Sequence, residues 1–341
     1  MAKHHYVSQF YLKKFCDPNT PVGHTPYIWV NDRKNTGWKK SSPGNCAYEI
    51  DLYSIPTDGS IPADSVEQLF SRIESETAKA YRGCLDAYNF PTREQKEVIA
   101  LFAACFAIRT PAYRSFIEKS SKEPIERFAE MLCSVPGAME NSLGNIGKST
   151  TEAESMREFL ADKNNYIIKI KSEWITAMGL STLTTIAQIL LDMKWKLLLA
   201  PFGERFLTSD SPADWEDPTM KGSFYGNKGL VMKNTEFILP LSPKLALLAG
   251  WNYTEGVFPV KKEKVWEISN RVIRHAKKEI YSQVPVNLIP LPKWEATQLF
   301  NAGNGICGDI RKQSTRPGAS CAQGAPPHIY DTANLPIRET D

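Results

Sequence analysis

Hydrophobic residues recur with a helical period through the middle of the chain. From Asp64 onward, apolar residues and one threonine stand three or four positions apart, which predicts an amphipathic helix that buries one stripe. Asp64 and Glu67 have the spacing of a capping box at the start of this helix. The stripe consists of Val66, Leu69, Phe70, Ile73, Thr77, Ala80, Tyr81 and Cys84.

A second predicted helix is apolar on nearly every side. Thr92 and Gln95 predict its N-terminus, and a helix as uniformly hydrophobic as Val98–Ile108 belongs at the centre of a core. The segment Arg109-Thr-Pro111 is expected to end or kink it, because proline disfavours a helical conformation in the residue before it. Further helices are expected at 113–133, 151–161 and 165–193, with a loop rich in glycine, serine and asparagine at 134–150.

Short β-branched and aromatic runs predict strands toward both ends of the chain. The N-terminal strands are expected at 26–30 and 47–55, and the turn Asp58-Gly59 and Pro62 follow them. Apolar runs separated by turn residues predict a C-terminal sheet with strands at 195–200, 205–208, 236–241 and 244–251, a covering helix at about 265–280 and a strand at 284–289. The tail from about Ala302 is rich in glycine and proline and is expected to be poorly ordered.

These patterns predict the α+β class, with a central helical core in one composite domain. The expected parts are a small N-terminal β-containing lobe at 1–62, the helical core at 63–193, a C-terminal α+β part with an antiparallel sheet at 194–300 and a disordered tail at 301–341. We expect the N-terminal run to pack against the helices near the turn at Ser209-Asp210.

Composition is that of an ordinary soluble protein, with 42% hydrophobic and 23% charged residues in 341. The 41 basic and 38 acidic side chains nearly balance, so charge alone does not indicate nucleic acid. The seven cysteines are scattered singly, which favours reduced thiols over disulfides or a zinc site. No secretory pattern opens the sequence, and Val98–Ile108 is shorter than the ~20 residues that span a bilayer. We expect a cytoplasmic protein without a membrane partner.

The first fifteen residues place His4, His5 and Gln9 inside an aromatic run. A buried imidazole or amide needs a hydrogen-bond partner or a ligand, so this run is a candidate site. Adjacent histidines point in different directions, and His5 is favoured because a helical turn would put Gln9 on its face. The structural alternative is a histidine that only completes core hydrogen bonds.

Charged residues beside predicted buried faces suggest partners for this site. Glu67 and Glu74 lie within about 20° of each other on one flank of their helix. This flank is either a solvated edge that forms surface ion pairs or a pair of carboxylates that binds a buried cation. Arg109 needs an anionic partner if buried, and Glu74 and Asp210 are the candidates. The carboxylate of Asp210 follows a strand, where it can project into a cleft or accept backbone N–H groups in an Asx-type turn. Asn270 lies off the apolar stripe of its helix, as surface residues do.

The sequence carries, in order, His5-Tyr-Val-Ser-Gln-Phe-Tyr-Leu-Lys-Lys-Phe15, Phe70-Ser-Arg-Ile-Glu74, Arg109-Thr-Pro111, Phe206-Leu-Thr-Ser-Asp-Ser-Pro212 and Pro240-Leu-Ser-Pro243. Over about residues 4–290, this series resembles the family catalogued as domain of unknown function 4238, with Ser8 where the family opening has proline. The resemblance implies a common fold and a source among bacteria and phages. No particular activity follows from it. It also implies a shared polar constellation of His5, Gln9, Glu74, Arg109, Ser209, Asp210 and Asn270.

Two functions from different classes fit these residues. The first is a hydrolase of phosphodiester bonds, such as a nuclease, that acts on nucleic acid or a nucleotide. Its catalytic residues would be His5, Gln9, Glu74, Arg109 and Asp210, with Ser209 and Asn270 as substrate contacts. The histidine would transfer protons, the two carboxylates would bind a divalent metal ion or act as base, and the arginine would clamp phosphate. The alternative is a non-catalytic sensor or interaction protein whose polar cluster is a structural network.

Other enzyme classes lack their motifs. The sequence has no Gly-x-x-x-x-Gly-Lys-Ser/Thr, His-Glu-x-x-His or Gly-x-Ser-x-Gly. The stretch 303–308 matches the letters of a dinucleotide-binding loop, but no strand precedes it and no helix follows, so we interpret it as chance. Arg271 and His275 share a helical face, as in some helical ribonucleases, at a spacing that also recurs by chance.

Overall fold

Helices and separate β-sheets make up this computed structural model, which confirms the predicted α+β class. The structure describes residues 3–33, 37–53, 64–219 and 229–288. Helix α3 (Arg93–Arg109) packs between α2 (Ser65–Gly83) and α7 (Ser172–Asp192). All positions of the predicted stripe on α2 are buried except Leu69. The predicted turn at Asp58-Gly59, the tail from Ala302 and the 303–308 stretch lie outside the described residues.

The two predicted capping boxes have different outcomes. At the start of α3, Thr92 Oγ1 accepts the backbone N–H of Gln95 and the side chain of Gln95 accepts the N–H of Thr92, as predicted. The box at the start of α2 is wrong. Asp64 makes no capping bond there, and its carboxylate instead accepts a hydrogen bond from Gln68 Nε2 at 3.0 Å.

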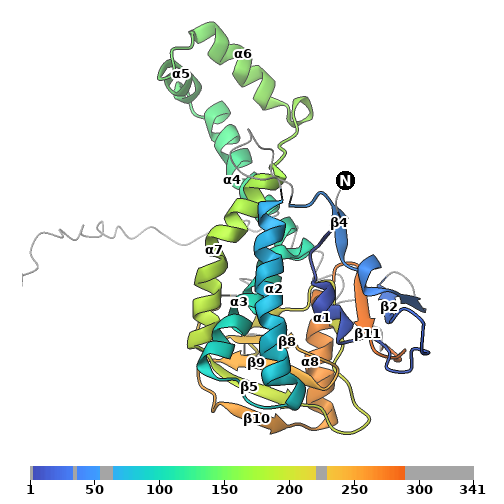
Figure 1. Cartoon of the computed structure of the whole chain (residues 1–341). Coiled ribbons are helices and arrows are strands. Elements are labelled where there is room, and N and C mark those ends of the chain that lie inside the picture. Colours follow the sequence, from blue (N-terminus) through green and yellow to red (C-terminus); the bar gives the residue numbers. More distant parts are fainter. Residues whose placement is uncertain (1–2, 34–36, 54–63, 220–228, 289–341) are drawn as a thin grey trace, which may run out of the picture. The chain divides into compact units, whose positions relative to one another are not determined.

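A helical arm extends from the end of α3 (Figure 1). Thr110 is extended at φ −76° and ψ 154°, and Pro111 takes the first position of α4 (Pro111–Ser134), so the segment ends one helix and begins the next. The arm continues through α5 (Ala138–Gly144) and α6 (Thr150–Ala161). The loop predicted at 134–150 is therefore wrong: Met139 of α5 is buried against Leu132 and Ala153, and this packing outweighs the turn-rich composition.

A five-stranded sheet lies between the helical layer and α8 (Lys262–His275) (Figure 1). Successive residues along its strands point to opposite faces, so Leu197, Leu239 and Leu247 face the helices. Leu198 and Leu248 face α8 instead. The order is β10 (Gly256–Pro259), β5 (Lys194–Leu199), β9 (Leu245–Gly250), β8 (Glu236–Pro240) and β7 (Asp214–Glu216), antiparallel except for the β10–β5 pair.

The N-terminal strands share a second sheet with C-terminal strands. Its order is β3 (Trp38–Ser41), β2 (Ile28–Asp32), β11 (Glu279–Ser282) and β6 (Thr208–Ser209), all antiparallel. Strand β1 (Lys3–His5) pairs separately with β4 (Tyr48–Ile50). Residues from opposite ends of the chain thus complete each other's backbone hydrogen bonds. Short 3-10 turns occur at Pro43–Asn45, Leu85–Ala87 and Lys163–Asn165.

Two C-terminal boundaries differ from the prediction. Helix α8 ends at His275, and Ile280, predicted to lie on it, belongs to β11. Among the described residues, the last strand is therefore Glu279–Ser282, and 284–288 are not a strand. Ala276 is extended at φ −54° and ψ 136°, and the carboxylate of Asp210 binds the amides that follow, which stops the helix there.

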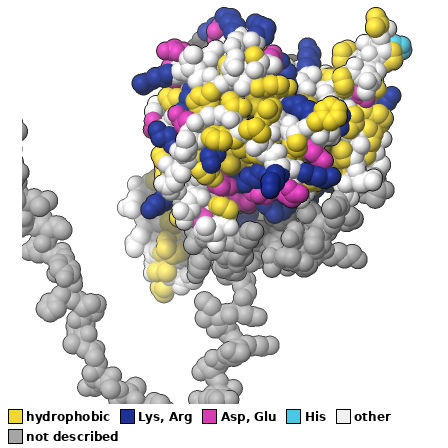
Figure 2. Space-filling view, turned by 90° about the horizontal axis from the view of Figure 1, so that it is seen from below, with side chains coloured by type: hydrophobic (Ala, Val, Ile, Leu, Met, Phe, Trp, Pro, Cys, Tyr) yellow, Lys and Arg dark blue, Asp and Glu magenta, His cyan; other side chains and the backbone are white. Residues whose placement is uncertain are grey.

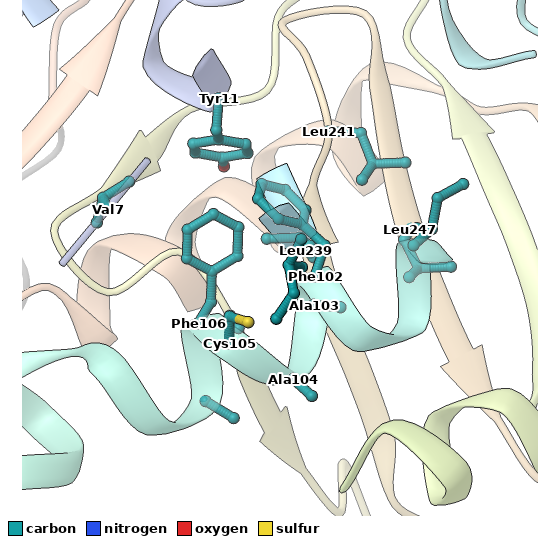
Figure 3. Packing of buried hydrophobic residues seen from close by; sticks show 14 of the residues in the cluster. Val7, Tyr11, Phe102, Ala103, Ala104, Cys105, Phe106, Leu239, Leu241 and Leu247 are labelled. Atoms are coloured by element: carbon teal, nitrogen blue, oxygen red, sulfur yellow. The ribbon is translucent and has the colours of Figure 1, made fainter. Parts of the chain in front are cut away.

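The N-terminal run packs into the core as predicted. Helix α1 (Gln9–Lys13) places the Tyr11 ring 4.9 Å from that of Phe106 and 6.4 Å from that of Phe102 (Figure 3). The Tyr11 hydroxyl donates to Pro240 O at 2.7 Å and lies 2.6 Å from Thr208 Oγ1. This places α1 against both α3 and the strand before Ser209-Asp210.

Helix α7 is long and apolar enough to cross a membrane by length and composition, and 28% of its most apolar window is buried. One side of the helix packs along α3. On the face of the molecule seen from below, Lys and Arg stand among Asp, Glu and hydrophobic side chains (Figure 2). The five cysteines in the described part of the chain, Cys16, Cys46, Cys84, Cys105 and Cys133, are free thiols.

Candidate functional site

Arg109 is the centre of a polar cluster between the N-terminal strand and the helical layer. It ends α3, the most apolar helix, and only 2% of its side chain is exposed. Its Nη1 donates to Glu74 Oε1 at 2.9 Å, and its Nη2 donates to the backbone carbonyl of His5. Its guanidinium carbon lies 4.1 Å from the centroid of the Phe70 ring. The predicted ion pair between Arg109 and Glu74 is confirmed.

Glu74 reaches Arg109 because of its position on α2. Its neighbour Ile73 and Thr77 one turn later are buried, so Glu74 stands on the edge of the buried stripe with 23% of its side chain exposed. The ion pair between Arg109 and Glu74 is therefore largely shielded from water. Removing either partner would leave the other charge buried and uncompensated.

His5 and Gln9 are in contact, but not through the predicted helical turn. His5 ends β1 and Gln9 begins α1, with Ser8 between them at φ −55° and ψ 131°. Nδ1 of His5 lies 3.4 Å from Gln9 Nε2, and Nε2 of His5 lies 3.3 Å from Gly44 O. Because a carbonyl only accepts, Nε2 carries the proton and Nδ1 accepts from the amide. Burial lowers the pKa of His5, which favours this neutral form.

His4 points to the other side of β1, as expected for adjacent residues of a strand. Its Nδ1 accepts the backbone N–H of Tyr53 at 2.8 Å, and its ring stacks on the Tyr53 ring at 5.7 Å between centroids. His4 is therefore held by hydrogen bonding within the chain, on the opposite side from Gln9.

The Ser209-Asp210 turn serves a different part of the fold. Asp210 is fully buried, and its carboxylate accepts the backbone N–H groups of Lys277 at 2.8 Å and Lys278 at 2.6 Å. Burial raises the pKa of Asp210, and these hydrogen bonds oppose the rise. Of the two predicted partners of Arg109, Glu74 is in place, while Asp210 binds the backbone that follows α8. The Asx-type alternative is thus right about amide binding, but the amides come from a distant segment.

Ser209 acts within its own turn. Its Oγ accepts the backbone N–H of Ser211 at 3.0 Å, and the residue has no exposed surface. The Ser209 hydroxyl therefore closes the turn after β6, while the Asp210 carboxylate binds amides after α8, and both groups are used internally.

Within the described ranges, no group of three or more His, Cys, Asp or Glu side chains could hold a metal ion. The two predicted metal ligands have separate partners: Glu74 pairs with Arg109, and Asp210 binds amides. Two surface grooves lie on the helical arm instead. One of about 510 Å³ is lined by residues of the α5–α6 region, and one of about 400 Å³ runs along α4.

A family model described as a protein of unknown function (DUF4238) matches residues 3–284. The chain belongs to this family. No curated protein and no solved structure matches it. The DUF4238 match covers the whole Arg109 cluster and the Ser209-Asp210 turn, so the sequence resemblance to this family is confirmed.

Two further predictions fall on α8 of this DUF4238 chain. Asn270 is exposed, whereas its neighbour Ser269 is buried and accepts the N–H of Leu207 at 3.2 Å, so the helix presents Asn270 to solvent. Arg271 and His275 do share a face, where both contact the buried Asp214, at 3.4 Å and 3.0 Å. The arginine also pairs with Glu236 at 2.9 Å. This face is an ion network between α8 and strands β7 and β8.

Glu67 is the cluster residue that the candidate list from sequence missed. Its Oε2 is buried without a hydrogen-bond partner, and burial raises the pKa of its carboxyl group, against the opposing influence of Arg109 and His4. The signal was its position seven residues before Glu74, on the same flank of α2. The sequence analysis named Glu74, on this flank, as a candidate partner of Arg109 but did not extend the cluster to Glu67.

Proposed function

We propose that this chain is a non-catalytic interaction protein, and that its polar cluster locks the N-terminal segment onto the helical layer. The observation that carries the proposal is that both terminal nitrogens of Arg109 are used inside the chain. Its two terminal nitrogens bind Glu74 and the His5 carbonyl, an aromatic ring covers its face, and 2% of its side chain is exposed. A phosphate clamp needs these same nitrogens to face a ligand.

The histidine supports the same interpretation. Both ring nitrogens of His5 have partners inside the chain, at Gln9 and Gly44. A general acid or base must reach a substrate proton directly or through one water molecule. Satisfied buried networks of this kind rigidify a fold and fix the positions of the segments they join. Here they join β1 and α1 to α2 and α3.

The helical arm supplies a surface for an interaction. Large hydrophobic side chains are exposed along the arm and on the first turns of α7, and another macromolecule that covers such side chains gains buried apolar area. Within 111–192 the exposed large hydrophobic side chains are Phe116, Ile125, Phe128, Met131, Val135, Ile146, Met156, Phe159, Ile167, Trp174 and Met178. We infer a protein partner that covers part of this surface.

Thermal denaturation of single variants tests the structural role of the cluster. His5→Ala, Gln9→Ala, Glu74→Ala and Arg109→Ala should each lower the melting temperature by several degrees, because each removes one member of a shared network. Retained or increased stability in these variants would contradict the proposal, since catalytic groups can often be removed without loss of stability. Glu76→Ala on the same helix is the matched control, because Glu76 pairs with Lys79 at the surface.

A second candidate function is the phosphodiester hydrolysis expected from the sequence. The observation in its favour is Glu67, whose raised pKa and unpartnered oxygen beside Arg109 suit a proton donor. A panel of nucleotides, RNA and DNA, with and without divalent metal ions, tests it. Turnover by the wild type that Glu67→Gln and His5→Ala abolish would establish hydrolysis and overturn the non-catalytic proposal. A nucleic-acid or nucleotide partner, a divalent metal cofactor, a bacterial or phage source and a cytoplasmic location remain predictions.

A further inference from the structure

Two aromatic side chains at the start of β2 form a right-angled corner (strand β2 is labelled in Figure 1). Tyr27 directly precedes the strand and Trp29 lies in it, two positions later. Their ring centroids are 5.9 Å apart, and their planes are inclined at 83° to each other. Both residues are partly exposed. These two rings, called the Tyr27–Trp29 corner below, are therefore within reach of a ligand.

A buried carboxylate fixes the orientation of both rings. Asp17 Oδ2 accepts hydrogen bonds from the Tyr27 hydroxyl at 3.2 Å and from Trp29 Nε1 at 2.9 Å. Its Oδ1 accepts the backbone N–H of Asn19 at 2.9 Å. Burial raises the pKa of Asp17, but the hydrogen bonds that it accepts outweigh burial and hold the pKa below its usual value. The corner is therefore held in one geometry and has a negative charge behind it.

An ammonium group of the chain already occupies this corner. Lys40 stands opposite Trp29 in the antiparallel pair of β2 and β3, and it is exposed. Its Nζ lies 4.4 Å from the centroid of the Tyr27 ring and 5.1 Å from that of the Trp29 ring. Both distances are in the range of cation–π attraction. Lys40 forms no ion pair with another described residue, so ring faces are what hold its charge.

We propose that the Tyr27–Trp29 corner is a binding site for a quaternary ammonium group, such as that of choline or of a trimethylated lysine, and that this ligand displaces Lys40. Aromatic ring faces that surround a cation are the chemistry by which proteins recognise such groups. The inference goes beyond the proposed function, because it depends neither on the Arg109 cluster nor on the helical arm.

The chemistry of the corner favours a methylated cation over Lys40 itself. A primary ammonium has three N–H donors and is strongly hydrated, so it loses hydrogen bonds to water on a surface that offers ring faces. A quaternary ammonium has no N–H donor, and its methyl groups gain from contact with aromatic surface. An exposed cation–π contact is weak, so competition from Lys40 reduces the affinity of the ligand only about two- to fivefold.

Charge favours a cation over a nucleic acid as the occupant. A base can stack on either ring, and exposed lysines can bind its phosphate. The base would, however, have to displace the ammonium from both rings, and the carboxylate of Asp17 behind them attracts a cation and repels an anion. The second exposed lysine of β3, Lys39, stands opposite Val30, so it lies on the other face of the strand pair.

Ligand-observed NMR titration of the full chain with choline tests the proposal. Choline should bind the wild type, and it should bind Lys40→Ala about two- to fivefold more tightly, because the competing ammonium is gone. Trp29→Leu and Tyr27→Leu, each combined with Lys40→Ala, should weaken choline binding about tenfold. The uncharged carbon analogue of choline, which has the same shape, should bind about tenfold more weakly than choline.

A protein-observed spectrum locates the binding. The indole N–H resonance of Trp29, identified by its loss in Trp29→Leu, should shift as choline is added. A peptide with a trimethylated lysine, titrated beside its unmodified form, distinguishes the two sources of the ligand. Tighter binding of the methylated peptide than of choline would indicate a protein as the source, and the reverse would indicate a small molecule; both results support the site.

Lys39→Ala is the matched control, since it removes the same charge from the other face of β3 and should leave choline binding unchanged. The proposal is overturned if neither choline nor the methylated peptide binds the wild type or Lys40→Ala. It is also overturned if the uncharged analogue binds as tightly as choline, if Lys39→Ala acts like Lys40→Ala, or if a single-stranded oligonucleotide shifts the Trp29 resonance and choline does not. Far-ultraviolet circular dichroism checks that every variant is folded.

Discussion

Arg109 on α3 donates to Glu74 on α2 at 2.9 Å, and the same guanidinium holds the backbone carbonyl of His5. One side chain thus ties two core helices to the first strand of the chain. Its Nε is buried without a partner, so the terminal nitrogens carry its hydrogen bonding. This arrangement makes the pair a structural junction whose contribution can be measured.

Replacing Glu74 should cost far more stability than replacing its neighbour on the same helix. Glu74→Gln leaves the buried Arg109 charge without its anion and should lower the free energy of unfolding by roughly 2–4 kcal/mol. Glu76→Gln breaks the surface pair with Lys79, at 2.6 Å, and should cost about 0.5 kcal/mol or less. Urea denaturation of both variants measures the difference, and equal losses would show that Arg109 does not depend on Glu74.

Stability should fall in mild acid because of His5. Burial lowers the pKa of His5 in the folded chain, so the unfolded chain binds the proton more readily. The contribution of neutral His5 is therefore present above about pH 6.5 and is lost as the pH falls below it. Melting temperatures from about pH 5 to 8 should show this slope in the wild type and a smaller one in His5→Gln. The exposed His24 is the control, because His24→Gln should keep the wild-type slope.

Removing one oxygen atom from Tyr11 should loosen the N-terminal run. Tyr11→Phe leaves Pro240 O and Thr208 Oγ1 without a buried partner, which should cost about 1–3 kcal/mol in the free energy of unfolding. Tyr88→Phe serves as the comparison, since Tyr88 is 42% exposed. If chemical denaturation gave the same small loss for both, the Tyr11 hydroxyl would not anchor α1 to the sheets.

Asp210 should tolerate even an isosteric amide poorly. Its two carboxylate oxygens each accept a different backbone N–H, from Lys277 and Lys278. Asp210→Asn replaces one carboxylate oxygen with an NH₂ group, which cannot accept the backbone N–H that faces it. The substitution should lower the free energy of unfolding by about 1–3 kcal/mol. Asp86→Asn, at the surface pair with Lys14, should cost about 0.5 kcal/mol or less. Hydrogen exchange at Lys277 and Lys278 should speed up only in the Asp210 variant.

Local patterns predicted the helical part of the fold well. Three features were predicted correctly: the stripe on α2, the Thr92 capping box and the break at Pro111. Each depends on residues within one or two helical turns of each other, so a short stretch of sequence is enough to predict it. Helix α5 was missed because its turn-rich segment is stabilised by packing of Met139 on the neighbouring helices α4 and α6. The short strands at the chain ends were placed least well, since strand pairing joins residues far apart in sequence.

The candidate site shows the same division. The sequence alone indicated that Arg109 would be buried and would need an anion, because charge at the end of an apolar helix cannot stay unpaired. Only the tertiary structure decided that Glu74 is that anion, and that Asp210 instead binds amides 67 and 68 residues further along the chain. It likewise decided that His5 and Gln9 meet across a strand-to-helix junction.

What the sequence by itself determined is the buried stripe of α2 apart from Leu69, the capping box of α3 and the break at Pro111. The tertiary structure decided which distant residues meet, because the cluster forms only where Arg109 reaches the carbonyl of His5, 104 residues away in sequence. The physical reason is the separation in sequence over which each kind of interaction acts. Helical periods and caps act through neighbouring residues, whereas a buried charge finds its partner only when distant segments have packed together.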